Sequence, residues 1–177
     1  ERPVDIDALP ELRGVLDCIY NPLRSTLVLD AQERGLPADG GLYMLVGQAV
    51  SARELFDGRP LPPETSAEIY GRILRSKRNL VLTGMPSCGK SSVGAELASR
   101  CGRRFVDTDE LVSLQAGMSI PEIFEREGEA GFRARETAAI ESVAAEQGLV
   151  IATGGGTIKD AENLQMLKNS GVVICLT

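Results

Sequence analysis

The stretch Gly84-Met85-Pro86-Ser87-Cys88-Gly89-Lys90-Ser91 follows the pattern G-x-x-x-x-G-K-[ST] and comes directly after the apolar run Leu80-Val81-Leu82-Thr83. Residues 91–99 have a helical pattern, so the loop lies between a predicted strand and a predicted helix. Glycines let backbone amides turn toward phosphate oxygens, and a helix start adds partial positive charge. We therefore predict a loop that binds a nucleotide phosphate chain. Its predicted binding residues are Gly84, Ser87, Cys88, Gly89, Lys90, Ser91 and Ser92.

The loop also predicts which side chains do chemistry. Lys90 is placed to reach the β- and γ-phosphates, and the Ser91 hydroxyl is a ligand suited to Mg²⁺. The 177-residue chain has no histidine, which excludes a histidine base and Ser-His-Asp hydrolysis. Any proton transfer must therefore use a carboxylate, lysine, tyrosine or water.

Strand and helix patterns alternate beyond the loop. Short apolar runs at residues 104–106, 149–152 and 172–176 alternate with helical patterns at 110–115, 120–127, 129–146 and 161–168. The strands are continuous apolar runs, which indicates burial on both faces and hence a parallel sheet covered by helices. We predict an α/β fold of the P-loop kinase type, with a sheet of about four strands.

Polar residues follow two of these strands. Asp107 and Asp109 end one strand, where one carboxylate can serve Mg²⁺ through water and the other can accept a proton. The alternative is a solvated pair, or an N-cap at Asp109. Three glycines, residues 154–156, follow the next strand and permit close approach of a ligand or form a flexible turn. Arg133 either binds a ligand carboxylate through paired N–H groups or belongs to a surface ion-pair set with Glu129 and Glu136.

The segment before residue 78 is organised differently. Residues 58–63 contain Gly58 and three prolines, which predicts a linker, and residues 64–75 form a polar helical pattern. Upstream we predict a short strand at 15–19 and helices at 26–34 and 42–56. An apolar stripe runs along the last helix: Leu42, Leu45, Val46, Ala49, Ala52 and Phe56. The expected domains are a small, mainly helical segment at 1–58, a linker and helix at 59–77, and the α/β domain at 78–177.

The composition indicates which classes of partner the chain can bind and which cell compartment it suits. A net charge of −6 argues against nucleic acid as a partner, and no apolar run is long enough for a membrane span. The four cysteines, Cys18, Cys88, Cys101 and Cys175, form no CxxC pair, which fits reduced thiols in a cytoplasmic protein. No feature of the sequence specifies an oligomeric state. The chain starts without Met and stops at Thr177 on a predicted strand, so we expect a truncated chain.

Residues 78–177 resemble shikimate kinase. The matching pieces are the loop at residues 84–92, the run at 105–109, Ile123-Phe124 with Gly131-Phe132-Arg133, and the run at 151–156. The resemblance implies that Asp109, Arg133 and Gly155 bind shikimate, with Arg133 pairing its carboxylate. It implies that Asp109 orients or deprotonates the 3-hydroxyl and that Lys90 is catalytic. It also implies that Ser91 and Asp107 serve Mg²⁺, and that ATP donates the phosphoryl group.

Residues 1–58 resemble the C-terminal end of shikimate dehydrogenase. The resemblance rests on Tyr20-Asn21-Pro22-Leu23, on the predicted helix with Gly35 and on the run at residues 40–48. It implies that Tyr20 and Gln48 touch shikimate and that Cys18 and Gly41 lie near NADP. A fused dehydrogenase–kinase is the simplest origin of such a chain. The segment lacks the family's catalytic Lys and Asp and its dinucleotide loop, so we expect no dehydrogenase activity.

The kinase-like segment also departs from its family. It stops before the lid with its arginine, the second shikimate-binding arginine, the adenine-side loop and the fifth strand. Three hypotheses follow: a shikimate kinase, a P-loop kinase of another small hydroxy compound such as gluconate or a nucleoside, and a truncated nucleotide-binding fragment without turnover.

Overall fold

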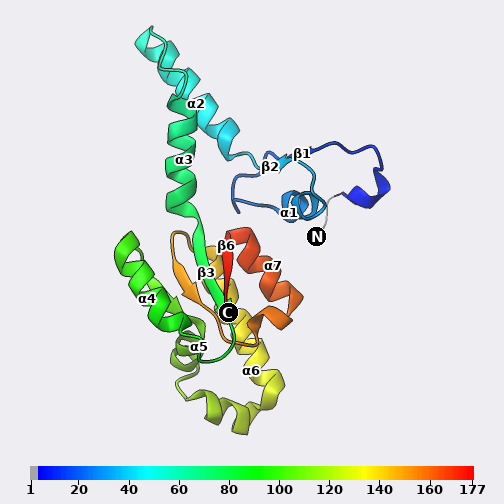
Figure 1. The fold of residues 1–177 in the computed structure, drawn as a ribbon, viewed down its shortest axis with the longest axis vertical. Helices are drawn as coiled ribbons and strands as arrows, with labels where there is room; N and C mark the ends of the chain where they lie inside the picture. The colour runs from blue at the N-terminus through cyan, green and yellow to red at the C-terminus, as the bar shows by residue number, and fades with distance from the viewer. Residues whose placement is uncertain (1–3) are drawn as a thin grey trace. The chain divides into compact units, whose positions relative to one another are not determined.

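The computed structural model describes residues 4–177. The chain forms two compact units, Glu1–Lys77 and Arg78–Thr177, with the boundary at the start of the kinase-like segment. Figure 1 traces both units from the blue N-terminus to the red C-terminus. Within the described residues, no helix is both long enough and apolar enough to cross a bilayer.

The second unit is built on a parallel sheet of four strands, as the sequence predicts. The strands are β3 (Asn79–Gly84), β4 (Phe105–Asp107), β5 (Val150–Ala152) and β6 (Gly171–Leu176). Their order in the sheet is β4-β5-β3-β6, so the strand leading into the phosphate loop lies in the interior. In register, Val81 of β3 is flanked by Ile151 of β5 and Val173 of β6.

Local signals set the boundaries of the helices in this unit: α4 (Lys90–Cys101), α5 (Thr108–Ala116), α6 (Ile120–Ala145) and α7 (Ala161–Ser170). Asp107 is the N-cap of α5 and accepts a hydrogen bond from the Asp109 amide. Ser119 and Glu122 form a capping box at the start of α6. The sequence predicts two helices where α6 stands, and α6 is in fact interrupted by non-helical backbone at Gly128.

Helices cover both faces of the sheet, on opposite sides in Figure 1. On one face, Leu82 and Val150 pack with Ala98 of α4. On the other face, the buried cluster contains Val81, Ile140, Val143, Leu149, Ile151 and Leu167, contributed by the sheet, α6 and α7. Because successive side chains of a strand point to opposite faces, Val81 and Leu82 enter different clusters.

The prediction that every strand is buried on both faces is wrong for β6. Its residues Val172 and Ile174 are both exposed, whereas β3 and β5 are almost wholly buried. Strand β6 is the last strand of the sheet, next to β3, whereas β3 and β5 are interior.

The first unit contains a small βαβ arrangement followed by two helices. Its elements are the 3₁₀ turn η1 (Ile6–Ala8), β1 (Val15–Leu16), α1 (Thr26–Glu33), β2 (Ala38–Asp39), α2 (Leu42–Asp57) and α3 (Thr65–Lys77). Strands β1 and β2 are parallel, and α1 forms the crossover between them. The buried apolar residues are few: Ile6, Val28, Leu29, Ala31, Leu42 and Val46. The unit is mainly helical, as predicted, with a thin core.

Two details of this unit differ from the sequence prediction. The strand predicted at 15–19 ends at Leu16, because the Asp17 carboxylate bonds the Ile19 amide at 3.0 Å and turns the chain. Its partner β2 was not predicted, since two residues are too short for a periodic signal.

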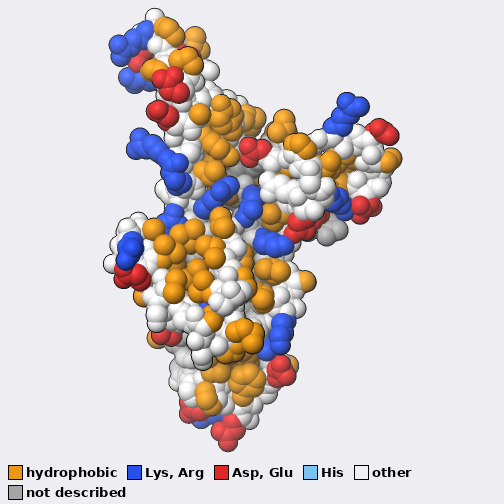
Figure 2. Space-filling view, viewed as in Figure 1, with side chains coloured by type: hydrophobic (Ala, Val, Ile, Leu, Met, Phe, Trp, Pro, Cys, Tyr) orange, Lys and Arg blue, Asp and Glu red, His pale blue; other side chains and the backbone are white. Residues whose placement is uncertain are grey.

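The apolar stripe of α2 is only partly buried. Leu42 and Val46 are covered, but Leu45 is exposed and Phe56 is 89% exposed. Figure 2 shows hydrophobic side chains gathered along α2. Helical periodicity correctly indicates a helix here, but it does not specify how much of the stripe the rest of the fold covers.

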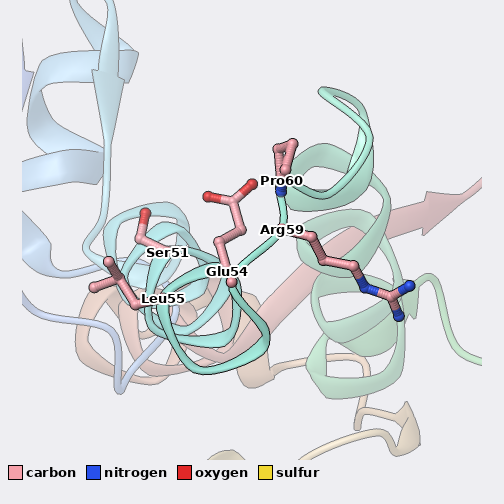
Figure 3. Close-up of a pocket in the computed structure, with 6 residues that line it drawn as sticks. Ser51, Glu54, Leu55, Arg59 and Pro60 are labelled. Carbon is pink, nitrogen blue, oxygen red and sulfur yellow. The ribbon is translucent and has the colours of Figure 1, made fainter.

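Two hollows adjoin α2. One, of about 340 Å³, is apolar and is lined by residues of α2 and α3 that include Val46, Ile69 and Ile73. The other, of about 510 Å³, lies at the end of α2, where Figure 3 shows the Arg59 side chain extending away from Ser51 and Leu55. Glu54 in this second hollow already bonds the Leu61 amide at 2.8 Å. The second hollow is lined by the polar residues Ser51, Glu54 and Arg59, but the Arg59 side chain extends away from Ser51, so these groups do not converge as in a catalytic site.

Candidate functional site

A cavity of about 430 Å³ lies where the carboxyl ends of β3, β4 and β5 meet. This is the edge at which open α/β sheets bind ligands. Its lining combines the loop after β3 with the residues that follow β4 and β5: Pro86, Ser87, Gly89, Lys90, Ser91, Ser92, Asp107, Asp109, Thr153 and Gly155. Residues far apart in sequence thus meet in one polar cavity.

The loop after β3 has the backbone geometry that a phosphate cradle needs. Gly89 is left-handed, with φ of 86°, and stands at the N-cap of α4. Ser87, with φ of 64°, is the one non-glycine residue with positive φ in residues 4–177. The Lys90 ammonium is held at the loop by the carbonyls of Gly84 and Met85, at 3.1 and 2.8 Å. The loop therefore brings backbone amides and a cation to one wall of the cavity.

Ser91 and Asp107 form the oxygen pair expected for Mg²⁺. The Ser91 hydroxyl donates to Asp107 Oδ2 at 2.6 Å, and both residues line the cavity. Hard oxygen donors suit Mg²⁺, which typically takes one or two protein ligands together with substrate phosphates and water. In the described part of the chain, no group of three His, Cys, Asp or Glu residues could hold a metal alone. The residues present fit a cation shared with a phosphate ligand.

Asp109 is the second carboxylate that lines the cavity. It lines the cavity beside Asp107, whose Oδ1 holds the Asp109 amide at 3.0 Å. Burial is the main cause that raises the pKa of Asp109, and the negative charges of Asp107 and Glu136 raise it further. Lys90 and Arg133 partly offset this effect. Asp107, and not Asp109, is the helix N-cap, so the alternative that assigned capping to Asp109 is wrong.

The glycine triplet lies in close contact with other residues of the site. A Cβ at Gly154 would lie 2.6 Å from Asp109 Oδ1, and one at Gly155 would lie 3.0 Å from Pro86 of the phosphate loop. A Cβ at Gly156 would lie 2.9 Å from Arg133 Nη1. The Gly154 amide is also fixed by the Thr108 hydroxyl at 3.2 Å. The triplet therefore joins the loop, Asp109 and Arg133, which argues against a merely flexible turn.

Arg133 is anchored by a buried carboxylate. Its Nη1 donates to Glu136 Oε2 at 2.8 Å, and its Nη2 lies 3.4 Å from the exposed Glu129. Glu136 is only 2% exposed, and its Oε1 accepts a 2.6 Å hydrogen bond from the buried Thr157. The hydrogen bond with Glu136 is the main cause that raises the pKa of Arg133. The surface ion-pair alternative therefore describes Glu129 but not Glu136.

Sequence reasoning placed Glu136 only in a surface ion-pair set with Arg133, and it missed Thr157. A signal for Glu136 was present, because it lies at helical spacing between the buried Phe132 and Ile140. A single carboxylate within an apolar stripe requires a partner when the stripe is buried. Thr157 follows the glycines in a short 3₁₀ turn and carried no comparable signal.

Most predicted kinase-site residues meet at the cavity. Ser87, Gly89, Lys90, Ser91, Ser92, Asp107, Asp109 and Gly155 line it. Gly84 and Cys88 lie behind the lining, where a Cβ on Gly84 would be 3.0 Å from Cys88 Sγ. Arg133 is also outside the lining set; its guanidinium lies beside Gly156, which follows the lining residue Gly155.

The four dehydrogenase-like positions lie in the first unit. Cys18 and Tyr20 follow β1, Gly41 follows β2, and Gln48 is exposed on α2. The Gly41 amide donates to the Ile19 carbonyl at 2.8 Å, and a Cβ at Gly41 would overlap the Cys18 carbonyl. Cys18 and Gly41 are thus close to each other.

Comparison with known proteins identifies the second unit. The family model described as "Shikimate kinase" matches residues 86–177, which is more than half of the chain. The chain belongs to the shikimate kinase family. The chain is 50% identical over 102 residues to a shikimate kinase of Geobacter metallireducens, covering 58% of this chain and 57% of the relative. It is 48% identical over 101 residues to a shikimate kinase of Synechococcus sp., covering 57% of this chain and 50% of the relative.

Solved shikimate kinases share the architecture. The structure of shikimate kinase from Acinetobacter baumannii in complex with shikimate matches with a TM-score of 0.57 and 42% identity, covering 59% of each chain. The Aquifex aeolicus shikimate kinase matches with a TM-score of 0.53 and 37% identity, covering 55% of this chain and 58% of that one. The chain thus spans little more than half the length of the relatives it matches.

Proposed function

We propose that this chain carries the phosphoryl-transfer site of a shikimate kinase, which moves the γ-phosphoryl group of ATP to the 3-hydroxyl of shikimate. One observation carries the proposal. The phosphate loop, the Ser91–Asp107 pair and Asp109 line a single cavity, and the glycine triplet connects this cavity to Arg133. A phosphate cradle, cation ligands, a base and a carboxylate fork are the parts that this reaction needs.

The donor side would be held by the loop after β3. Its amides and the Lys90 ammonium would bind the β- and γ-phosphates, and Ser91 with Asp107 would hold Mg²⁺. When bound, Mg²⁺ would neutralise phosphate charge. The positive start of α4 adds a fixed partial charge directed at the same place.

The acceptor side would be held by Asp109, Arg133 and Gly155. The Arg133 guanidinium would pair with the shikimate carboxylate, while the Gly155 backbone approaches the ring. The acceptor oxygen would form its bond to the γ-phosphorus as the bond to the ADP oxygen breaks, and Asp109 would take the hydroxyl proton. A raised pKa makes the Asp109 carboxylate a better proton acceptor than an ordinary aspartate.

A coupled assay of shikimate-dependent ATP consumption tests the proposal. We expect turnover by this chain, and loss of turnover in Lys90→Ala. The matched control is Lys159→Ala, which removes an exposed lysine outside the cavity lining and should leave turnover unchanged. Retained turnover in Lys90→Ala would refute the assigned role.

Two other outcomes would replace the proposal. Binding of ADP without shikimate-dependent turnover would indicate a nucleotide-binding fragment, a possibility raised by the chain's partial coverage of its relatives. Turnover with gluconate or a nucleoside but not with shikimate would indicate a kinase with another acceptor.

We also propose that residues 1–58 derive from the C-terminal end of a shikimate dehydrogenase fused to the kinase. The close approach of Cys18 to Gly41, after two parallel strands, supports a ligand-facing loop pair there. Tyr20 and Gln48 would be the remaining ligand positions. We expect no NADP-dependent oxidation of shikimate by this chain, and a measurable rate in that assay would contradict this expectation.

The four free cysteines fit a reducing compartment, which we propose is the cytoplasm.

A further inference from the structure

Helix α6 is interrupted by non-helical backbone a short distance before Arg133 in the sequence. Gly128 has φ of 71° and ψ of −172°, which breaks the helix between residues 120–127 and the segment that carries Arg133. An L-residue with a side chain rarely adopts this backbone conformation, so the break depends on glycine.

Two further features fix the geometry of the break. Glu127 accepts two hydrogen bonds from the Arg135 guanidinium, with Nε to Oε2 at 2.8 Å and Nη2 to Oε1 at 2.7 Å. A Cβ at Gly131 would overlap the Cβ of Glu127, so Gly131 leaves the room in which Glu127 turns back to meet Arg135. The hydrogen bonds from Arg135 are the main cause that lowers the pKa of Glu127.

The break also lies between residues that must stay aligned at the site. Phe124, before the break, stacks on Phe132, after it, with ring centroids 4.7 Å apart. The Arg133 guanidinium in turn lies 5.3 Å from the centroid of the Phe132 ring. A change in the angle at Gly128 would therefore move Phe124 relative to Phe132 and disturb the aromatic pair that the Arg133 guanidinium contacts.

We propose that the Glu127–Arg135 ion pair is a positioning element that sets the angle of α6 at Gly128 and so holds Phe132 and Arg133 for the acceptor. The inference rests on the proposed function for its choice of acceptor. Neither residue of the pair is part of the cavity lining. A two-bond fork is better suited to this task than a single contact, because it fixes orientation as well as distance.

The test uses the full chain and three changes: Glu127→Gln, Arg135→Gln and their double variant. We measure the shikimate Kd and the ADP Kd by calorimetry, and amide exchange by mass spectrometry. The side chains are 31% and 35% exposed, so we expect a modest effect, about a three- to fivefold rise in shikimate Kd. ADP affinity should stay within about twofold, and exchange should accelerate in residues 120–127 but not in β3.

Three variants test whether the ion pair itself causes the loss of affinity. The double variant should be no worse than either single variant, because all three remove the same interaction. Gly131→Ala keeps both charges but displaces Glu127, so it should reproduce the loss. Glu96→Gln breaks the exposed Arg100–Glu96 pair of α4 and should change neither affinity.

Several results would overturn the proposal. These are unchanged shikimate affinity with unchanged exchange in residues 120–127, additive effects in the double variant, or a parallel loss of ADP affinity, which would indicate general loosening. If the unsubstituted chain binds no shikimate, the proposed function fails. Exchange alone then decides the role of the ion pair: faster exchange in 120–127 supports it and unchanged exchange overturns it.

Discussion

The buried bond between Thr157 and Glu136 allows the most direct test of the site's construction. Thr157→Val replaces the hydroxyl by a methyl group of similar size, so it removes the 2.6 Å bond to Glu136 Oε1 without opening a cavity. Thr157 is 0% exposed and Glu136 is 2% exposed, so water cannot easily take the place of the lost donor. Glu136 would keep its bond to Arg133 but lose the other.

The magnitude follows from the charge and the burial of the acceptor. A hydrogen bond to a charged group contributes about 1.5–3 kcal/mol. We therefore expect the free energy of unfolding to fall by about 2 kcal/mol. With a urea m-value of roughly 2 kcal/mol/M, the midpoint of unfolding would fall by about 1 M.

Urea denaturation followed by far-UV circular dichroism measures this change, with amide exchange in β3 and β5 to localise it to the second unit. Thr157→Ser is the matched control, because it keeps the hydroxyl and loses only a methyl group. It should recover most of the lost stability. Ser76→Ala, which removes an exposed bond to the Ile73 carbonyl, should change stability by less than about 0.5 kcal/mol.

A loss below about 0.5 kcal/mol in Thr157→Val would refute the reasoning. It would mean that the hydroxyl does not stabilise the buried Glu136 carboxylate. Equal losses in Thr157→Val and Thr157→Ser would also refute it, since packing and not the hydrogen bond would then explain the effect.

Three further predictions concern single residues. Because burial and the charges of Asp107 and Glu136 raise the pKa of Asp109, its contribution to stability is complete below pH 3.8 and is lost as pH rises through the folded-state value. Asp109→Asn should therefore increase the resistance to urea at pH 7 and weaken the pH dependence of stability, and it should abolish turnover because the proposed base is lost. Lower resistance to urea at pH 7 would contradict the predicted direction. Ser87→Gly should stabilise the chain by up to about 1 kcal/mol in urea denaturation, since it relieves the left-handed backbone, and a clear loss would count against strain there. Asn79→Ala should lower the free energy of unfolding by about 3 kcal/mol in the same assay. The fully buried Asn79 side chain donates to two carbonyls at the end of α6 and accepts a hydrogen bond from the Leu149 amide before β5. A loss below about 1 kcal/mol would be inconsistent with that role.

Much of the second unit could be predicted from the sequence because its signals are local. The glycine pattern at residues 84–91, the apolar runs and the change from strand to helix periodicity all act within a few residues. They indicated the four parallel strands, the phosphate loop and the break at Gly128. The same signals failed for the two-residue strand β2, which is too short to show a period.

Much of the candidate site could be predicted as well, but not its internal support. Asp107, Asp109 and Gly155 followed strands, and strand ends meet at one edge of a parallel sheet. The partner of Arg133 was left open, since Glu129 and Glu136 both lie within one helical turn of it. Only the packing of α6 on the sheet buried Glu136 and left Glu129 exposed.

The sequence by itself determined the phosphate loop, the alternation of strands and helices, and the family. These depend on backbone conformations that neighbouring residues specify. The tertiary structure alone decided the strand order, the exposed face of β6, and the network of Arg133, Glu136 and Thr157. Such features depend on contacts between segments far apart in the chain, and burial, which sets the strength of a charge or hydrogen bond, exists only once those segments have packed.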